Sequence, residues 1–334
     1  MELFSRWMSL LPIFFISCFF GLGRATDCGG NNVTQTLIVG KYGQAAFRTI
    51  QAAIDSVKSN NDQWVKIHIK AGFYMESVVI PVDKPCIILE GEGIRTIVSH
   101  WDHQSINNNA TFTSFSSNLM ASDITFKNSY NVATDKYLEN KIEPANAARL
   151  SGDKYLFSRC RFIGYQDTLY DLMGRHVFKD CYIQGEVDFI YGNGQSYYQN
   201  CSINAMGRFP NLPGFVTAQG RKSADDPSGF VFEGGSIVGN VKVNLGRAWR
   251  PYSRVIFKNT YFSDIVTPHG WVAWRAASNE NATTYAEVDC KGPGADTSKR
   301  VAWMKKLSSS DLNEFSFASF INSDGWVHNL PTIS

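Results

Sequence analysis

The stretch "LFSRCRFIGYQDTLYDLMGRHVFKDCYIQGEVDFIYGNGQSYYQNCSI" (residues 156–203) contains a repeated strand pattern. Three segments in it, "LFSRCRF", "VFKDCYI" and "YYQNCSI", alternate apolar and polar residues around Cys160, Cys181 and Cys201, which are 21 and 20 residues apart. Three further segments align on the same position, "MASDITF", "VFEGGSI" and "IFKNTYF", anchored by Ile124, Gly235 and Thr260. Short strands repeated at this period predict a solenoid whose coils each contribute parallel strands.

We therefore expect an all-β chain folded as a parallel β-helix. The strands are rich in β-branched and aromatic residues, the turns contain Gly and Asn, and helical periodicity is almost absent. Leucine-rich repeats have a similar period but need a leucine ladder, which these segments lack. A β-sandwich remains the alternative, because short and regularly spaced strands also occur in sandwiches.

One segment has convincing helical periodicity, "AAFRTIQAAIDSVKSN" (45–60). It places Phe47, Ile50, Ile54 and Val57 at spacings of three and four. We expect this helix to cap the open end of the solenoid and cover its terminal apolar layer. The strands should begin after it, in "VKIHIKAGFYMESVVI", and the last forty residues should wrap the outside.

The first residues have the features of a secretory signal peptide, which we place at residues 1–25. An apolar run from Met8 to Phe20 follows Arg6 and precedes small residues that suit cleavage. A membrane anchor is the weaker alternative, because this run is shorter than the ~20 residues that a spanning helix needs. Residues 26–334 should then form a single domain that is secreted to the extracellular space.

Charge and cysteine usage argue against two classes of function. The formal net charge of +2 is too small for the electrostatic field that nucleic-acid binding requires. No cysteine pair has C-x-x-C spacing, so a zinc site is not expected. The three stacked cysteines lie within disulfide reach of one another if the coils are ~4.8 Å apart, but their pairing is left open. Four sequons fit a secreted glycoprotein, at Asn32, Asn109, Asn200 and Asn281.

Two aspartates occupy the same place in successive repeats. Asp167 follows Cys160 by seven residues, and Asp188 follows Cys181 by seven. Adjacent parallel strands lie ~4.8 Å apart, so the two carboxyl groups should project side by side, where both do not ionise easily. An enzyme uses such a pair as nucleophile or base and as acid. The alternative, an Asp that caps a turn through its own backbone, suits an isolated residue better than two in register.

Several ordered motifs resemble the signature blocks of plant pectin methylesterases (pectinesterases). "GYQDTLY", "GEVDFIYGNG" and "LGRAWRPYSRVIF" look like three of these blocks, and "GFYMESV", "VTAQGR" and "GWVAW" match others in the same order. The resemblance covers the chain from about Thr34 onward. It implies a right-handed parallel β-helix that hydrolyses the methyl ester on C6 of galacturonate in pectin and releases methanol.

The resemblance also implies a role for each matched residue. Asp188 would be the nucleophile, and Asp167 the general acid that then becomes the general base. Gln166 would donate a hydrogen bond to the tetrahedral oxyanion. Arg247 would hold Asp188 ionised and oriented and contact the substrate, and Trp249 would contact the sugar. This chemistry needs no metal or other cofactor.

These roles agree with the physical chemistry of the residues. The positive charge of Arg247 would lower the pKa of Asp188, whereas Asp167, beside Tyr165 and Tyr170, should hold its proton longer. Arg247 as a surface ion-pair former and Trp249 as a core residue are the alternatives.

The chain departs from the family blocks at several positions. Where the family has Q-A-V-A-L-R, with a second oxyanion glutamine, this chain has "PANAARL" (144–150), and Pro144 stands where that glutamine is expected. Proline has no side-chain donor, so the second hydrogen bond is lost there. Glu186 replaces Thr in GTVDF, and on a strand it would face the same way as Asp188 and raise the pKa of that acid. Tyr191 replaces Phe in DFIFG.

The expected partner is methylesterified homogalacturonan of the cell wall, with a proteinaceous pectinesterase inhibitor as a further partner. The chain is expected to be a monomer without nucleic-acid or membrane partners and without the inhibitor-like pro-region of many plant members. A calcium-dependent lyase would need an acidic cluster, and a glycosidase would need acid motifs, that we do not find. A non-catalytic pectin-binding protein remains the alternative function, because Pro144 weakens the oxyanion site.

Overall fold

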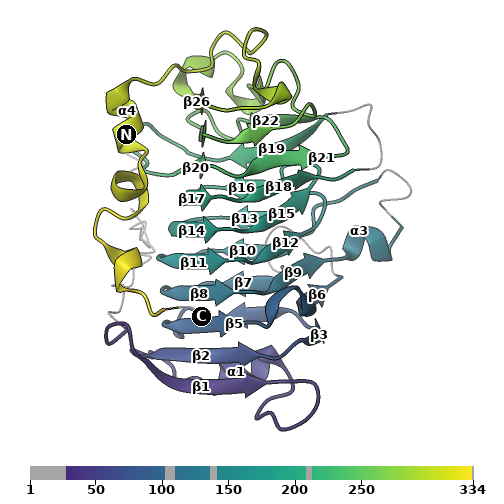
Figure 1. The fold of residues 1–334 in the computed structure, drawn as a ribbon, viewed down its shortest axis with the longest axis vertical. Helices are drawn as coiled ribbons and strands as arrows, with labels where there is room; N and C mark the ends of the chain where they lie inside the picture. The colour runs from purple at the N-terminus through teal and green to yellow at the C-terminus, as the bar shows by residue number, and fades with distance from the viewer. Residues whose placement is uncertain (1–27, 102–109, 136–140, 208–212, 333–334) are drawn as a thin grey trace, which may run out of the picture.

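The computed structural model describes residues 28–101, 110–135, 141–207 and 213–332, so the expected signal segment lies outside the described residues. Short strands wind through these ranges into coils that stack along one axis (Figure 1). Neighbouring strands pair in parallel, as β11 does with β14. The predicted parallel β-helix is confirmed, and the β-sandwich alternative is wrong. No helix within these ranges is long and apolar enough to cross a membrane.

The strands form three sheets, which we call A, B and C. Sheet A contains, in spatial order, β1 (Val33–Val39), β2 (Trp64–Ile69), β5 (Ile87–Glu90), β8 (Leu119–Ser122), β11 (Tyr155–Ser158), β14 (Arg175–Lys179), β17 (Gln195–Gln199), β20 (Gly229–Glu233), β23 (Arg254–Lys258) and β26 (Thr284–Val288). Sheet B contains β3 (Gly72–Met75), β6 (Thr96–His100), β9 (Thr125–Asn128), β12 (Arg161–Ile163), β15 (Tyr182–Gly185), β18 (Ser202–Ala205), β21 (Ser236–Gly239) and β24 (Tyr261–Phe262). Sheet C contains β4 (Val78–Ile80), β7 (Phe112–Ser114), β10 (Ala148–Leu150), β13 (Leu169–Asp171), β16 (Ile190–Gly192), β19 (Gly214–Gln219), β22 (Val243–Arg247) and β25 (Trp271–Val272).

Helical segments are short and lie at the ends and in the connections. They are α1 (Ile50–Ser56), η1 (Gly93–Arg95), α3 (Tyr130–Ala133), η2 (Trp274–Ala276), η3 (Glu280–Ala282), η4 (Pro293–Ala295), α4 (Ser309–Glu314), η5 (Phe317–Ile321) and η6 (Trp326–Asn329).

Each of the six aligned segments turns the corner from sheet A to sheet B at the residue just before its anchor. That residue has a left-handed backbone in every segment: Asp123, Arg159, Asp180, Asn200, Gly234 and Asn259. Gly, Asn and Asp adopt this conformation more readily than other residues. The period in the sequence is therefore the period of a tight corner that is repeated in every coil.

Inside the coils, sheet A presents a continuous column of aromatic rings. Phe157, Phe178, Tyr198, Phe232 and Phe257 pair in register on consecutive strands. Their ring centroids are 5.2, 4.6, 4.4 and 4.4 Å apart, and neighbouring planes are within 16° of parallel. The strand spacing itself brings the rings to stacking distance, so each coil buries its apolar face against the next.

The stacked cysteines remain thiols, so no bridge joins the coils through Cys160, Cys181 or Cys201. The Cys181 thiol donates to the Phe157 carbonyl at 3.5 Å, and the Cys201 thiol donates to the Phe178 carbonyl at 3.4 Å. These small buried side chains thus fill the corner and bond to the coil before them. The disulfide of the described chain joins Cys28 to Cys86 instead.

The helix α1 caps the first coil, as predicted, but it is shorter than the periodic segment. It begins at Ile50, because the preceding residue, Thr49, is its N-cap. The Thr49 hydroxyl accepts a hydrogen bond from the Ala52 amide. Phe47 lies before the helix, in a bridge with Val39. The expectation that the strands begin only after this helix is wrong, since β1 precedes it and pairs with β2.

Of the last forty residues, which were expected to wrap the outside, residues 307–332 cover the outer face of sheet A, whereas Val301, Trp303 and Met304 pack against the core inside the coils. Phe315, Phe320, Ile321 and Trp326 pack on a row of outward side chains, Val177, Tyr197, Val231, Ile256 and Ala286. Figure 1 shows this segment in yellow beside the left edge of the coils.

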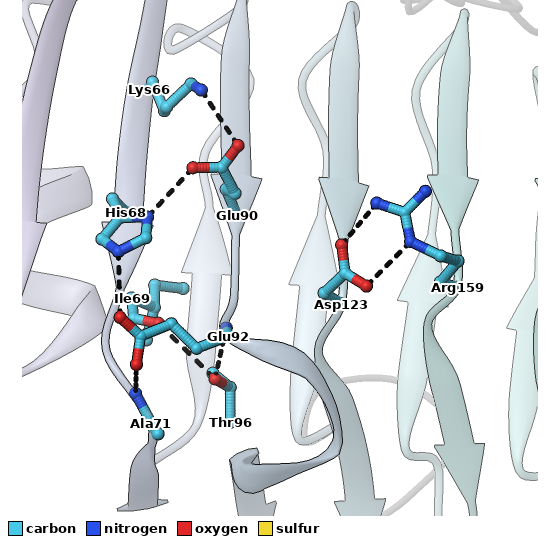
Figure 2. A network of polar contacts seen from close by, with 9 residues as sticks. All are labelled: Lys66, His68, Ile69, Ala71, Glu90, Glu92, Thr96, Asp123 and Arg159. Atoms are coloured by element: carbon cyan, nitrogen blue, oxygen red, sulfur yellow. Dashed lines mark hydrogen bonds and ion pairs between the residues drawn. The ribbon is translucent and has the colours of Figure 1, made fainter. Parts of the chain in front are cut away.

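Elsewhere on the outer face, charged side chains pair between neighbouring coils (Figure 2). Glu90 of β5 binds Lys66 and His68 of β2, both at 2.9 Å. Arg159 binds the Asp123 carboxylate at 2.9 and 2.6 Å. Both are corner residues, in adjacent coils, and Arg159 is the one that is least suited to a left-handed backbone. These contacts are partly exposed and contribute little to stability individually.

The Cys28–Cys86 disulfide should stabilise the N-terminal end of the solenoid. Its sequence separation is 58 residues, which in the chain-entropy model corresponds to about 4 kcal/mol. We expect the double substitution Cys28→Ser and Cys86→Ser to lower the free energy of unfolding by a large part of this amount, as measured by denaturant titration. Reductant should destabilise the wild-type protein and leave the double variant unchanged. Equal sensitivity of both to reductant would contradict the assignment of this bond.

Candidate active site

The two aspartates lie at equivalent corners of adjacent coils. Asp167 follows β12 and Asp188 follows β15, each at the corner that leads from sheet B to sheet C. Both have a left-handed backbone, with φ of 59° and 49°, and the Asp167 amide donates to the Val187 carbonyl at 3.0 Å. Each of the two residues is 7% exposed. The register predicted from the sequence is confirmed.

Arg247, the last residue of β22, binds Asp188 through both carboxylate oxygens. Its Nε and Nη2 donate to Oδ1 and Oδ2 at 2.7 and 2.5 Å. The guanidinium lies over the rings of Phe215 and Trp274, at 4.3 and 4.0 Å from their centroids. A bidentate ion pair whose cation is held over two aromatic rings fixes the orientation of the Asp188 carboxylate.

Burial raises the pKa of both aspartates, but their neighbours separate them. For Asp188, the hydrogen bonds and positive charge of Arg247, and the charge of Arg275, oppose that rise in pKa. For Asp167, burial is reinforced by the negative charge of Asp188 and only weakly opposed by Arg247, and the pKa rises to about 8. At neutral pH the site thus favours a carboxylate at Asp188 and a protonated acid at Asp167.

Tyrosine rings form the surroundings of Asp167 in sheet C. Tyr170 and Tyr191 pair on adjacent strands and stack at 4.3 Å and 7°. The charge of Asp167 raises the pKa of both hydroxyls, in each case as a smaller effect than burial. Tyr170 lies near this acid, as expected, and Tyr165, which was also expected there, is half-buried in the same corner between β12 and β13.

Gln166 precedes Asp167 and pairs on its two sides with Pro144 and Val187. Its side chain is half-buried. Pro144 therefore lies in the adjacent coil at the same ladder position, which is where the family blocks put the second glutamine. The position at which the motif indicates a lost side-chain donor is therefore directly beside Gln166.

Trp249 lies at the edge of the tyrosine stack and is half-buried. Its indole is 5.9 Å from the Tyr191 ring, and it packs against Gly220, where a Cβ atom would come within 2.8 Å of the indole. Trp249 is thus neither a fully buried core residue nor isolated on the surface. It extends an aromatic surface on sheet C that begins beside Asp167.

The expectation for Glu186 rested on strand alternation, and that premise is wrong. Glu186 and Asp188 belong to the corner between β15 and β16, where the left-handed backbone of Asp188 breaks the alternation of side chains. Burial, rather than Glu186, is the main cause of the raised pKa of Asp188. Burial also raises the pKa of Glu186 itself, to about 7, and its carboxylate lies against Gly207.

Sequence reasoning missed the residues that support Arg247. Phe215 and Trp274 hold its guanidinium, and Arg275 adds a second positive charge near Asp188. Trp274 ends the block "GWVAW", and Phe215 directly precedes "VTAQGR", so their positions in recognised motifs were the available signal.

This arrangement is suited to acyl transfer. An oriented carboxylate acts as a nucleophile, and an adjacent protonated acid gives its proton to the group that leaves. Both groups come from the chain itself, and Gln166, the half-buried residue before Asp167, carries a side-chain amide of the kind that serves as an oxyanion donor.

Comparisons with known proteins agree with the motifs. A family model described as Pectinesterase matches residues 36–324. Among Arabidopsis thaliana proteins, the chain is 48% identical to Probable pectinesterase 55 over 299 residues, which are 88% of this chain and 91% of that protein. It is 46% identical to Probable pectinesterase 29 over 301 residues, 89% of this chain and 90% of that protein. Among solved structures, pectin methylesterase from carrot has a TM-score of 0.81 and 31% identity, covering 90% of this chain and 95% of that one.

The coupling between the two aspartates is directly measurable. We expect Asp188→Asn to lower the pKa of Asp167 from about 8, because the substitution removes a negative charge that raises it. A pH titration followed by carboxyl ¹³C NMR measures this change. Glu186→Gln is the matched control and should leave the pKa of Asp167 unchanged. If Asp188→Asn had no effect on it, the two carboxyl groups would not be electrostatic neighbours.

Proposed function

This chain belongs to the pectinesterase family and removes methyl esters from pectin, and we propose that Asp188 and Asp167 perform this hydrolysis as nucleophile and general acid/base. The observation that carries the proposal is the division of charge between two adjacent carboxyl groups. Arg247 binds Asp188 through two hydrogen bonds, and no hydrogen-bond partner for the Asp167 carboxyl is found in the described part of the chain. The two acids are therefore suited to opposite tasks.

In the first half of the reaction, an Asp188 oxygen attacks the carbonyl carbon of the C6 methyl ester. The Gln166 amide donates to the oxyanion that forms, and Asp167 gives its proton to the methoxy oxygen. The carbon–oxygen bond to the methoxy group breaks, and methanol leaves. The galacturonoyl group is then joined to Asp188 as an acyl-enzyme anhydride.

In the second half, a water molecule attacks the acyl carbon, and Asp167, now a carboxylate, takes a proton from that water. Asp188 leaves as a carboxylate, so both aspartates return to their starting states. The galacturonic acid product then ionises and releases one proton. Arg247 stabilises the charge of Asp188 before attack and again when it leaves.

The aromatic surface of sheet C supports a role in sugar binding. Trp249 presents a half-buried ring beside Tyr191, and sugar rings pack their apolar faces on such side chains. We assign the substrate contact of this family to Trp249 together with Arg247. Methylesterified homogalacturonan is the proposed substrate, and a proteinaceous pectinesterase inhibitor is a further proposed partner of a monomeric enzyme.

Secretion to the cell wall, after removal of residues 1–25, is part of the proposal. The Cys28–Cys86 disulfide is typical of an oxidising compartment. Three of the four sequon asparagines, Asn32, Asn200 and Asn281, are exposed, and Asn109 lies outside the described residues. These features support a glycosylated protein that meets pectin outside the cell.

The secreted protein should release methanol from highly methylesterified pectin without shortening the polymer. Asp188→Ala should lower this rate by roughly 10³-fold or more, because the nucleophile is lost. Methanol release and polymer length are followed in parallel, and circular dichroism checks that both proteins are folded. Polymer cleavage would favour a lyase or glycosidase, and a folded wild-type protein that releases no methanol at any pH would favour pectin binding alone.

The pH dependence of kcat/KM should follow the two acids. Asp167 must be protonated in the first step, so activity should fall as pH rises through about 8, the pKa of Asp167. Asp188 must be ionised, so activity should also fall at acid pH. The midpoint of this acid limb should lie above the usual pKa range of Asp, because the pKa of Asp188 is raised. Methanol release should be measured rather than proton release, since the product acid titrates. A rate that stays constant well above pH 8 would argue against Asp167 as the acid.

A further inference from the structure

Two departures from the family blocks meet at one hydrogen bond. Asn146 stands where the block Q-A-V-A-L-R has valine, and Tyr191 stands where DFIFG has phenylalanine. In the structure the Asn146 Nδ2 donates to the Tyr191 hydroxyl at 2.9 Å. Both side chains are buried, 7% and 4% exposed. Two apolar positions have thus been replaced by a hydrogen-bonded polar pair.

The same amide also binds the backbone of the proposed acid. Asn146 Nδ2 donates to the Asp167 carbonyl at 2.5 Å, at the residue whose φ is 59°. Asn146 is itself held by the preceding coil, because its carbonyl accepts from the Thr111 amide at 3.1 Å and from Asn128 Nδ2 at 3.1 Å. One fixed side chain therefore joins the Asp167 corner to the Tyr191 hydroxyl.

The hydrogen of the Tyr191 hydroxyl is available for a second bond. The Asn146 amide is a donor, so the tyrosine oxygen accepts there, and no acceptor for its own hydrogen is found among the residues that the structure describes. The ring is held by the Tyr170 stack and by Trp249. The groups whose charge is coupled to the Asp167 carboxyl are Asp188, Arg247, Tyr170 and Tyr191, and Arg149 faces the two tyrosines.

We infer that Asn146 and Tyr191 are a positioning pair for Asp167, in which Asn146 fixes the backbone of the acid and Tyr191 directs its hydroxyl hydrogen to the Asp167 carboxylate. The inference rests on the proposed role of Asp167 as general acid and base. The bond forms when Asp167 has given up its proton to methanol, and it stabilises the carboxylate until that group takes a proton from water. The pair thus acts on the second half of the reaction, beside the position where Pro144 has removed a donor.

Tyr191→Phe and Asn146→Val test this pair, and each installs the residue of the family block, so the variants are compatible with the fold. Loss of the tyrosine hydrogen bond to the carboxylate should raise the pKa of Asp167 and move the alkaline limb of kcat/KM upward by roughly one pH unit. KM should change little. Asn146→Val should move the alkaline limb in the same direction, because the Tyr191 hydroxyl is oriented by its hydrogen bond with Asn146. For the same reason, the double variant should move the limb no further than either single variant.

Tyr182→Phe is the matched control. Tyr182 accepts a hydrogen bond from Asn204 Nδ2 at 2.7 Å on sheet B and donates to Gln184 Oε1 at 2.9 Å, so it forms a tyrosine–asparagine pair whose hydroxyl hydrogen goes to an amide instead of an acid. It should leave the pH profile unchanged. An unmoved alkaline limb in Tyr191→Phe, with or without a lower kcat, would overturn the inference, as would additive shifts in the double variant. Full activity in Asp188→Ala would instead overturn the proposed function, so the two failures are distinct.

Discussion

The register between consecutive coils is the constraint on which the rest of this structure depends. Parallel strands place equivalent residues of successive coils about 4.8 Å apart. That spacing brings Phe157, Phe178 and Tyr198 to stacking distance inside sheet A, and it brings Asp167 and Asp188 together at the corner between sheets B and C. The same geometry is favourable for rings and unfavourable for two negative charges, so the aspartate pair is stable only if one carboxyl stays protonated or a cation compensates the other.

Arg247 supplies that cation from 59 residues further along the chain. It reaches Asp188 because β22 lies two strands beyond β16 in sheet C, and two aromatic rings hold its guanidinium in place. Two identical side chains at equivalent positions thereby acquire different protonation states. The difference between the two acids comes from one ion pair that contacts only Asp188.

The sequence predicted well those features of the fold and the site that repeat along the chain or belong to a recognised motif. The cysteine period located the coils, and the seven-residue offset placed Asp167 and Asp188 in register. Reasoning failed where the backbone leaves the strand, as at Glu186, because the left-handed backbone of Asp188 breaks the alternation. It also failed for Phe215 and Trp274, since their contacts with Arg247 join distant coils and leave no local period.

The C-terminal segment, residues 307–332, limits how this architecture is able to vary. It contacts the outer face of sheet A at Ala286 of β26 and continues to Leu330, which packs with Ile88 of β5 and Met120 of β8. Coils of a solenoid otherwise contact only their neighbours, so repeats are readily gained or lost and the ends fray independently. The C-terminal segment acts as a strap: it spans most of the stack of coils and couples the two ends of the stack into one cooperative unit. Its length must match the number of coils, so duplication or deletion of a single coil would leave the strap out of register with the surface that it covers.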